Sequence, residues 1–312
     1  MRFKNTLSIV IDNFVNVFKM LLYRLVTDVI FFSLVYVILT LSLKGIVKSA
    51  EATEIFRLIK EFFSALVSGN VEYLSGFQAL FNSAVAAFWE MLKLHIGSIV
   101  WSVVGICLLY LCGRFANGLC VFAVGHAVND RMQVYAHAKF STAYFKNLGK
   151  AALYQIIYVP MIFVYDVLTV LLCYFFFFYA LSFLPLIITI AMAVTGIVCL
   201  QALKFTVISA WLPAVIADDE RVCAAMRKSF ARKQGFGKRF VGFLVVIYMI
   251  IVLNVTVAVC TLGSGLLLTV PVSFLLLLCM QFVNYFEDEK KKYFIAYDKI
   301  VNAEKKADVI GE

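Results

Sequence analysis

The sequence predicts an all-α membrane protein that crosses the bilayer six times. Of its 312 residues, 63% are apolar and only 15% are charged, and the mean hydropathy is +0.93. A soluble domain is usually about 45–50% apolar and about 25% charged. The apolar residues come in runs of about twenty rather than in alternation, which is typical of membrane helices and excludes a lipid-facing β-barrel. The same figures exclude a disordered chain, a secreted disulfide scaffold and an ordinary soluble enzyme.

Six segments are long enough to span a hydrocarbon core about 30 Å thick, which needs about 20 residues at about 1.5 Å each. We predict spans at residues 25–47, 97–121, 152–174, 184–208, 240–260 and 266–286, all within one integral membrane domain, 1–312. Residues 151–217 are apolar almost throughout, so we place a turn at 175–184, just before Pro185. The five residues from Thr261 to Gly265 are too few for anything but a tight hairpin.

The orientation follows from the loop charges. Residues 1–24, 122–151, 209–239 and 287–312 together hold 21 Lys and Arg, whereas the 48–96 loop with Lys44 holds five, matched by five Glu. Because positive loops stay inside, both termini, the 209–239 loop and the 287–312 tail are predicted to be cytoplasmic.

The long outer loop, 48–96, has the pattern of two amphipathic helices. One apolar stripe comprises Ile55, Leu58, Ile59, Phe62, Phe63 and Leu66, and Ser68-Gly69 ends it. A second stripe comprises Phe77, Leu80, Phe81, Val85, Phe88 and Leu92. Such helices either lie on the outer membrane surface or cap the bundle. Their apolar stripes serve either for packing or as part of a lid that gathers substrate.

An internal repeat is also suggested, because an amphipathic cytoplasmic stretch precedes each odd-numbered span. The apolar positions of the three stretches are Leu7, Ile11, Phe14 and Phe18, then Phe140, Tyr144 and Leu148, then Val222, Met226 and Phe230. Each unit would be an interfacial helix followed by a two-span hairpin. The repeats would be parallel rather than inverted, and chance similarity between apolar helices is the alternative.

Polar side chains inside spans are costly, and they are therefore the candidate site residues. Asp28 and Arg114 lie about 9 and 10 Å from the cytoplasmic surface, counted at about 1.5 Å per residue, and we predict an ion pair between them. By the same count Asp166, Asn254 and Ser273 form a second layer about 21 Å deep.

No signature of a catalytic, metal or cofactor site is present in the sequence. The motifs H-E-x-x-H, G-x-x-x-x-G-K-[ST], G-x-G-x-x-G and G-x-S-x-G are missing. We therefore predict no enzyme activity, no catalytic residue, no metal site and no cofactor. His126 and His137 share a loop with Asp130, and a metal or acid–base use of these three is the alternative. The acidic run 218–220 either binds a cation or, as we expect, begins the helix that follows it.

The basic stretches 227–239 and 290–306 lie directly beside spans. Attraction to anionic lipid headgroups explains them, so we expect the bilayer and possible membrane-protein partners to bind this chain, and no nucleic acid. The run 287–292 carries both signs of charge and is interpreted as a solvated helix start.

Two runs near the fourth span carry a family resemblance. They are Trp-Leu-Pro-Ala-Val-Ile-Ala-Asp-Asp-Glu at 211–220 and Ala-Ala-Met-Arg-Lys-Ser-Phe at 224–230. They are similar to the membrane domain attached to some bacterial glycerophosphodiester phosphodiesterases. Tyr-Phe-Lys-Asn at 144–147 resembles the YesL-like membrane proteins. The resemblance implies a bacterial cytoplasmic (inner) membrane and assigns no catalytic residue.

The function expected from these features is that of a non-enzymatic accessory or structural component of transport or envelope processes. The alternative is a small-solute or ion transporter that uses the polar layer around Asp166.

Overall fold

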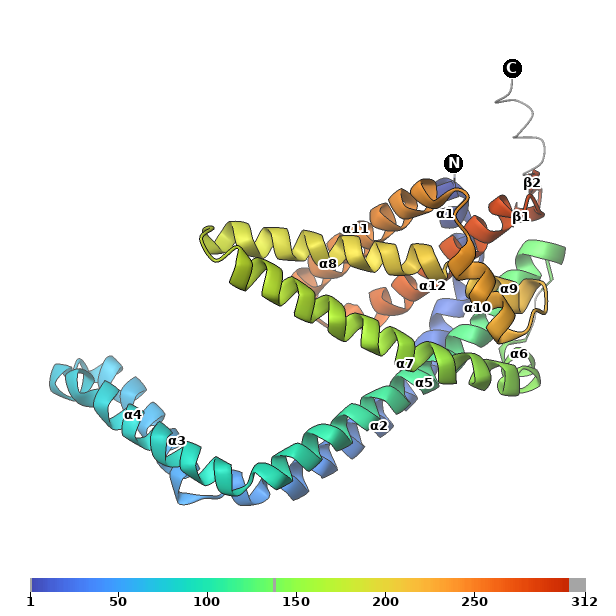
Figure 1. The fold of residues 1–312 in the computed structure, drawn as a ribbon. Helices are drawn as coiled ribbons and strands as arrows, with labels where there is room; N and C mark the ends of the chain where they lie inside the picture. The colour runs from blue at the N-terminus through green and yellow to red at the C-terminus, as the bar shows by residue number, and fades with distance from the viewer. Residues whose placement is uncertain (1, 137–138, 303–312) are drawn as a thin grey trace. The chain divides into compact units, whose positions relative to one another are not determined.

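The structure, a computed structural model, describes residues 2–136 and 139–302 (Figure 1). These residues are almost entirely helical, and six of their helices are long and apolar enough to cross a membrane. The six are Val15–Val47, Ile96–Val134, Leu148–Ala180, Leu186–Ala217, Phe236–Thr261 and Leu266–Asp288. The predicted all-α polytopic fold is therefore confirmed, and each span contains or closely matches a predicted segment.

The chain divides into two compact units, and each is described by itself. One unit comprises Met1–Thr27 and Arg114–Glu312, and the other comprises Asp28–Gly113. The prediction of one integral domain stays a prediction. Helices α2 (Val15–Val47) and α5 (Ile96–Val134) each begin in one unit and end in the other.

Helix α12 (Leu266–Asp288) lies at the centre of the first unit. The remaining helices of this unit are α1 (Arg2–Asp12), α6 (Phe140–Lys146), α7 (Leu148–Cys173), α8 (Leu186–Ile208), α9 (Trp211–Ala217), α10 (Val222–Ala231) and α11 (Phe236–Thr261). Helix α11 packs against α8 and α12, and α1 packs along the last turns of α12. Trp211, Phe243 and Phe282 are fully buried in the common core. Burial of such large side chains contributes about 1.5–3 kcal/mol each.

Both predicted hairpins between spans are present, but the first turn is shorter than the predicted 175–184 and begins only after Ala180. Helix α7 continues as the π-helix η1 (Tyr174–Ala180), and Pro185 is the residue before α8. Proline has no amide hydrogen to donate, which suits a helix start. Between α11 and α12, Leu262 and Gly263 adopt φ values of +51° and +87°, so the chain reverses within a few residues.

A short helix precedes each odd-numbered span, namely α1, α6 and α10. The apolar positions predicted for the first interfacial helix are mostly exposed. Ile11 is 75% exposed and Phe14 and Phe18 are also exposed, whereas the buried residues of α1 are Asn5, Thr6, Ile9 and Val10.

In α10, Val222 is buried with Ala225 and Ser229, and Phe230 is exposed. Whether the exposed apolar positions lie on the membrane surface stays a prediction.

The solvated helix predicted to start at 287–292 is wrong. Helix α12 ends at Asp288, and β1 (Lys292–Ala296) pairs in antiparallel register with β2 (Lys299–Asn302). Aromatic and β-branched residues favour strands, and two residues suffice for the turn. Tyr293 is buried against α1, where its hydroxyl donates to Glu287 at 3.0 Å and accepts from the Asn5 amide at 2.8 Å.

The second unit contains the two helices predicted for the long loop. Helices α3 (Ala50–Ser68) and α4 (Val71–Leu94) pack side by side as an antiparallel pair (Figure 1). Ser49 caps α3 by accepting from the amide of Ala52, and Gly69 ends it with a φ of +69°. A left-handed residue after the last turn is the usual helix stop, and glycine adopts it without strain.

Candidate functional site

The polar centre of the spans is the carboxylate of Asp166 on α7. The Lys204 ammonium donates to its Oδ1 at 2.7 Å, and the Gln201 amide donates to the same oxygen at 3.1 Å. The Arg114 guanidinium lies 3.4 Å from Oδ2. The four residues, from α5, α7 and α8, are called the Asp166 cluster below. It joins three membrane helices through charged side chains.

The Asp166 cluster holds two cations and one carboxylate. Lys204 is only 7% exposed at its side chain, so it is almost fully withdrawn from the surroundings. A lone ammonium in an apolar environment is costly, and the hydrogen bond to Asp166 relieves that cost. The N–H groups of Arg114 and Lys204 are the kind of donors that bind anionic groups.

The pairing of α7 with α8 positions the cluster. The Tyr165 hydroxyl donates to the backbone carbonyl of Leu200 at 2.6 Å, which fixes the register of the two helices beside Asp166. Gln201 and Lys204 are three residues apart on α8 and so lie on the same face of the helix. Lys204 also lies 5.2 Å from the centre of the Phe205 ring. Within this site, aromatic faces and one carboxylate surround the ammonium group.

The residue count placed Arg114 and Asp166 in different layers, but their side chains meet at 3.4 Å. That count started from residue 121, whereas α5 continues to Val134. Along the helices, at about 1.5 Å per residue, Arg114 lies about 30 Å from the end of α5 and Asp166 about 27 Å from the start of α7 at Leu148. Their depths in the membrane stay predictions. Asp28 belongs to the other unit, so its predicted ion pair with Arg114 stays a prediction.

The two other candidates, Asn254 on α11 and Ser273 on α12, do lie together. The Asn254 amide donates to the Ser273 hydroxyl at 3.0 Å and to the carbonyl of Ile250 at 2.9 Å. Its carbonyl oxygen accepts from the hydroxyl of Thr269 at 2.6 Å. Interhelical bonds of this kind contribute about 0.6 kcal/mol each in membrane proteins. The predicted layer therefore divides into a helix clamp at Asn254 and a separate Asp166 cluster.

Sequence reasoning missed Lys204 and Gln201 as members of a site. Lys204 is visible as a charge inside an apolar run, but its partner depends on the register of the α7–α8 hairpin. Extending the first helix to Ala180, as the structure does, places residue 166 opposite residue 200. Pairing the two helices in that register would have identified Gln201 and Lys204 as neighbours of Asp166.

The acidic run 218–220 has a different role from the one predicted. Helix α10 begins at Val222, and each carboxylate pairs with a cation from another part of the chain or from α10. Asp219 bonds to Lys150 at 2.5 Å, Glu220 bonds to Lys228 at 2.9 Å, and Asp218 bonds to Lys291 and to the Tyr285 hydroxyl. Burial alone would raise the pKa of Asp218, but these two hydrogen bonds outweigh it and lower that pKa.

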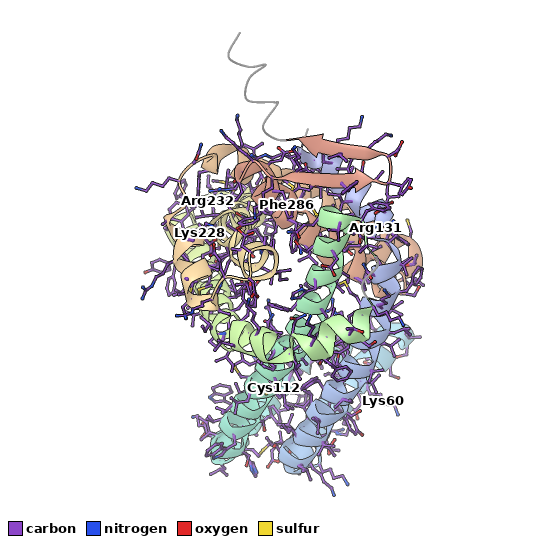
Figure 2. The ribbon with its side chains drawn as sticks, turned by 90° about the vertical axis from the view of Figure 1, so that its right-hand side faces the viewer. Lys60, Cys112, Arg131, Lys228, Arg232 and Phe286 are labelled. Atoms are coloured by element: carbon purple, nitrogen blue, oxygen red, sulfur yellow. The ribbon has the colours of Figure 1, made fainter. Side chains whose placement is uncertain are left out.

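Arginine side chains from other helices form ion pairs with carboxylates at the end of α12. Arg2 bonds to Glu287 at 3.1 Å and to Asp288 at 2.6 Å, and Arg239 donates to Asp288 at 2.8 Å. Arg232 pairs with Glu289 at 2.5 Å, and Figure 2 shows it beside Lys228 on the same side as Phe286. A separate pair, Arg131 with Asp12 at 2.6 Å, joins α5 to α1. Of these cations, Arg232 and Arg239 belong to the basic stretch 227–239 that the sequence assigned to lipid headgroups.

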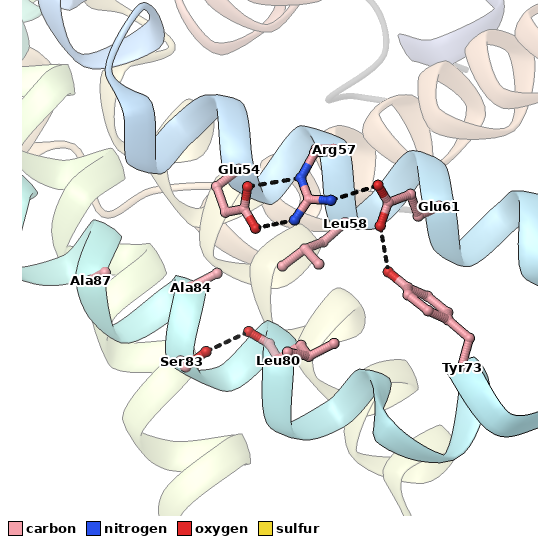
Figure 3. Close-up of a pocket in the computed structure, with 9 residues that line it drawn as sticks. All are labelled: Glu54, Arg57, Leu58, Glu61, Tyr73, Leu80, Ser83, Ala84 and Ala87. Carbon is pink, nitrogen blue, oxygen red and sulfur yellow. Dashed lines mark hydrogen bonds and ion pairs between the residues drawn. The ribbon is translucent and has the colours of Figure 1, made fainter.

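A groove of about 390 Å³ lies between α3 and α4 in the second unit (Figure 3). Arg57 lies between Glu54 and Glu61, with nitrogen–oxygen distances of 2.5 and 2.7 Å, and the Tyr73 hydroxyl donates to Glu61 at 3.1 Å. The hydrogen bond from Arg57 holds the pKa of Glu54 below its ordinary value. Arg57 thus pairs with both carboxylates of this groove, which carries one formal negative charge in excess.

No group of three or more metal-binding side chains occurs in residues 2–136 and 139–302. His126 and Asp130 lie on α5, while His137 lies outside the described residues. The chain matches no family model, no curated protein and no solved structure.

Proposed function

We propose that this protein is a transport component of the bacterial cytoplasmic membrane, with both termini in the cytoplasm, and that the Asp166 cluster binds an anionic solute. The observation that carries the proposal is the arrangement of Arg114 and Lys204 around one carboxylate within apolar spans. Intramembrane charges of this kind commonly mark solute or ion pathways. The two cationic side chains support an anion rather than a cation as the solute.

In this proposal Arg114 and Lys204 are the groups that contact the solute. Before the solute binds, Asp166 keeps both cations in position. When the anion supplies further acceptor oxygens, the bonds from Arg114 and Lys204 to Asp166 weaken. Gln201 offers a further donor on the same face of α8. This proposal involves no covalent step.

The test is anion flux into vesicles that contain the full chain, with chloride, inorganic phosphate and acetate as probes. We expect saturable flux of at least one probe in the wild type and its loss in Arg114→Gln and Lys204→Met. Asn254→Ala serves as the matched control, because it removes a polar group from the neighbouring clamp and leaves the cluster unchanged. Equal flux in the wild type and in both cluster variants would overturn the proposal.

A second candidate is the accessory or structural role, and the Asp166 cluster offers an observation in its favour. Asp166 accepts bonds from three side chains on two other helices, which is also what a structural tie between helices requires. In that role the cluster variants would lose stability without any flux being measurable in the wild type. Such a result would favour the accessory function. A wild-type flux that does not saturate with the concentration of any of the three probes would favour it as well. The resemblance to YesL-like proteins supports the membrane setting of both candidates.

A further inference from the structure

Helix α3 has two separate apolar faces. Leu58 and Ala65 are 3% and 7% exposed and pack against α4, where the ring of Phe62 lies 4.5 Å from that of Phe77. A second set of apolar residues is exposed in the second unit, namely Phe56, Ile59, Phe63, Leu66 and Val67. This second set is called the α3 stripe below. Sequence periodicity had merged the two faces into one.

The α3 stripe is continuous along the helix. At about 100° per residue its five members fall within an arc of about 100°, which is the width of a typical buried helix face. Phe63 is 62% exposed and Val67 is 89% exposed, so the stripe contacts nothing comparable within its own unit. Glu54, Arg57 and Glu61 lie on another side of the helix, where they pair with one another. The stripe is thus free of charge and flanked by a charged face.

Both ends of the α3–α4 pair are attached to membrane spans by very short connections. Helix α2 ends at Val47 and α3 begins at Ala50, while α4 ends at Leu94 and α5 begins at Ile96. Two connecting residues reach at most about 10 Å. Figure 1 shows the pair bending away from α2 and α5 at these two places. The first turn of α3 therefore lies at the boundary where the spans leave the hydrocarbon.

Two exposed tryptophans mark the same boundary. Trp89 on α4 and Trp101 on α5 are 60% and 77% exposed, and they lie on either side of the His95 connection. Tryptophan concentrates at membrane–water interfaces, where its ring is partly apolar and its N–H is solvated. The exposed apolar surface of α2, which includes Leu41 and Val47, reaches the connection on the other side.

We propose that the α3 stripe inserts into the lipid leaflet next to the ends of α2 and α5, so that α3 lies along the membrane surface. Lipid is the occupant that these observations favour, because the stripe continues the lipid-facing surface of the adjoining spans. The charged face of α3 then points towards water and α4, as an interfacial amphipathic helix requires. This goes beyond the proposed transport function and does not depend on it.

The test uses the full chain with its eight cysteines replaced, reconstituted in phosphatidylcholine vesicles. A nitroxide label is attached in turn to Phe63→Cys, Ser64→Cys and Leu58→Cys, and its collisions with oxygen and with a water-soluble nickel chelate are compared. Oxygen should dominate at position 63 and nickel at position 64, while position 58 should be shielded from both. Ser64 is the matched control because it is exposed and polar and lies about 100° round the helix from Phe63, on the side of Arg57.

Two outcomes would overturn the proposal. Dominance of nickel at position 63 would place the α3 stripe in water. Spin–spin broadening at position 63 that disappears on dilution with unlabelled protein would show that a second copy covers it. The chain with its native cysteines provides a second measurement. Phe63→Glu with Val67→Glu adds no trypsin site, and it should detach α3 from the membrane surface and speed tryptic cleavage after Arg57 and Lys60 several-fold. Unchanged cleavage would also count against lipid insertion.

Discussion

The ammonium of Lys204 lies 2.7 Å from Oδ1 of Asp166, and the Lys204 side chain is almost fully buried. The two residues come from consecutive antiparallel helices, so their bond fixes α8 against α7. Removing the carboxylate would leave the ammonium buried without its counter-ion, a situation in which stability is usually lost.

We predict that Asp166→Ala destabilises the protein in detergent by about 3 kcal/mol, at the lower end of the range for a broken buried pair. The double variant Asp166→Ala with Lys204→Met should lose less than the sum of the two single losses, because no charge is stranded. Unfolding in a series of denaturing detergent concentrations measures each loss. Additive losses would mean that the bond contributes nothing to stability.

Two different ion-pair partners are assigned to Arg114, and a comparison of two double-mutant cycles distinguishes them. The structure pairs it with Asp166, whereas residue counting predicts Asp28. We expect the Arg114→Ala and Asp166→Ala double-mutant cycle to show a coupling of about 0.6–1.7 kcal/mol, the range measured for polar pairs in membranes. The Asp28→Ala cycle with Arg114→Ala tests the other pair in the same assay. A larger coupling with Asp28 would contradict the arrangement described for the cluster.

Acid should remove the contribution of Asp218 to the stability of the folded protein. Its pKa is lowered in the folded state by Lys291 and Tyr285, so the ionised form stabilises the protein at neutral pH. That stability is present above the unfolded-state pKa of about 3.9 and is lost as pH falls through the lower folded-state pKa. The melting temperature of Asp218→Asn should be below that of the wild type at pH 7, and the gap should close below about pH 4. A gap that stays constant down to pH 3 would exclude this linkage.

Gly118 on α5 makes room for the buried amide of Gln155. A Cβ atom at position 118 would lie 2.3 Å from the Gln155 side chain, which is only 3% exposed. We therefore expect Gly118→Ala to cost about 1–3 kcal/mol of stability, as overpacked sites do. Adding Gln155→Ala should restore much of that loss. Gly149→Ala is the control, since nothing lies within 4 Å of its added Cβ, and a glycine inside a helix usually gains about 0.5–1 kcal/mol from that change.

The predicted orientation, which is based on the distribution of Lys and Arg, can be tested separately. In a background without native cysteines, a membrane-impermeant thiol reagent added to intact cells should label Ser68→Cys and should not label Gln234→Cys. Both positions are exposed, so access to the reagent decides the result. The opposite pattern would invert the orientation, and labelling at both positions would contradict six spans.

Much of the helical architecture was predictable, because hydropathy and helix stops are local properties of the chain. The turn before Pro185, the hairpin at Leu262 and the break at Gly69 each follow from residue chemistry at one place. The end of α5 was not predictable in this way. Residues 122–132 are mostly buried by other parts of the protein, and their polarity resembles that of a loop although Val124 and Val128 are fully buried.

The site was less predictable than the fold, since its members meet through tertiary register. Asp166, Arg114, Asn254 and Ser273 were recognised as polar residues inside spans, and Asn254 with Ser273 was also placed in one layer. The pairing of Asp166 with Lys204 required the position of the α7–α8 turn to within a few residues. The acidic run was misread because its partners, such as Lys150 and Lys291, are distant in sequence.

The contacts of Arg2 with Glu287 and Asp288 join residues 285 and 286 positions apart. A ribosome adding about 5–20 residues per second makes the second partner roughly 15–60 s after the first. During that interval α1 has left the ribosome while these two carboxylates do not yet exist. The apolar side of α1, with Ile11 exposed, gives the nascent helix a place on the membrane surface in the meantime. The other end of α1 can pair earlier, through Asp12 with Arg131, so α1 is held first at Asp12 and at Arg2 only after the last span is complete.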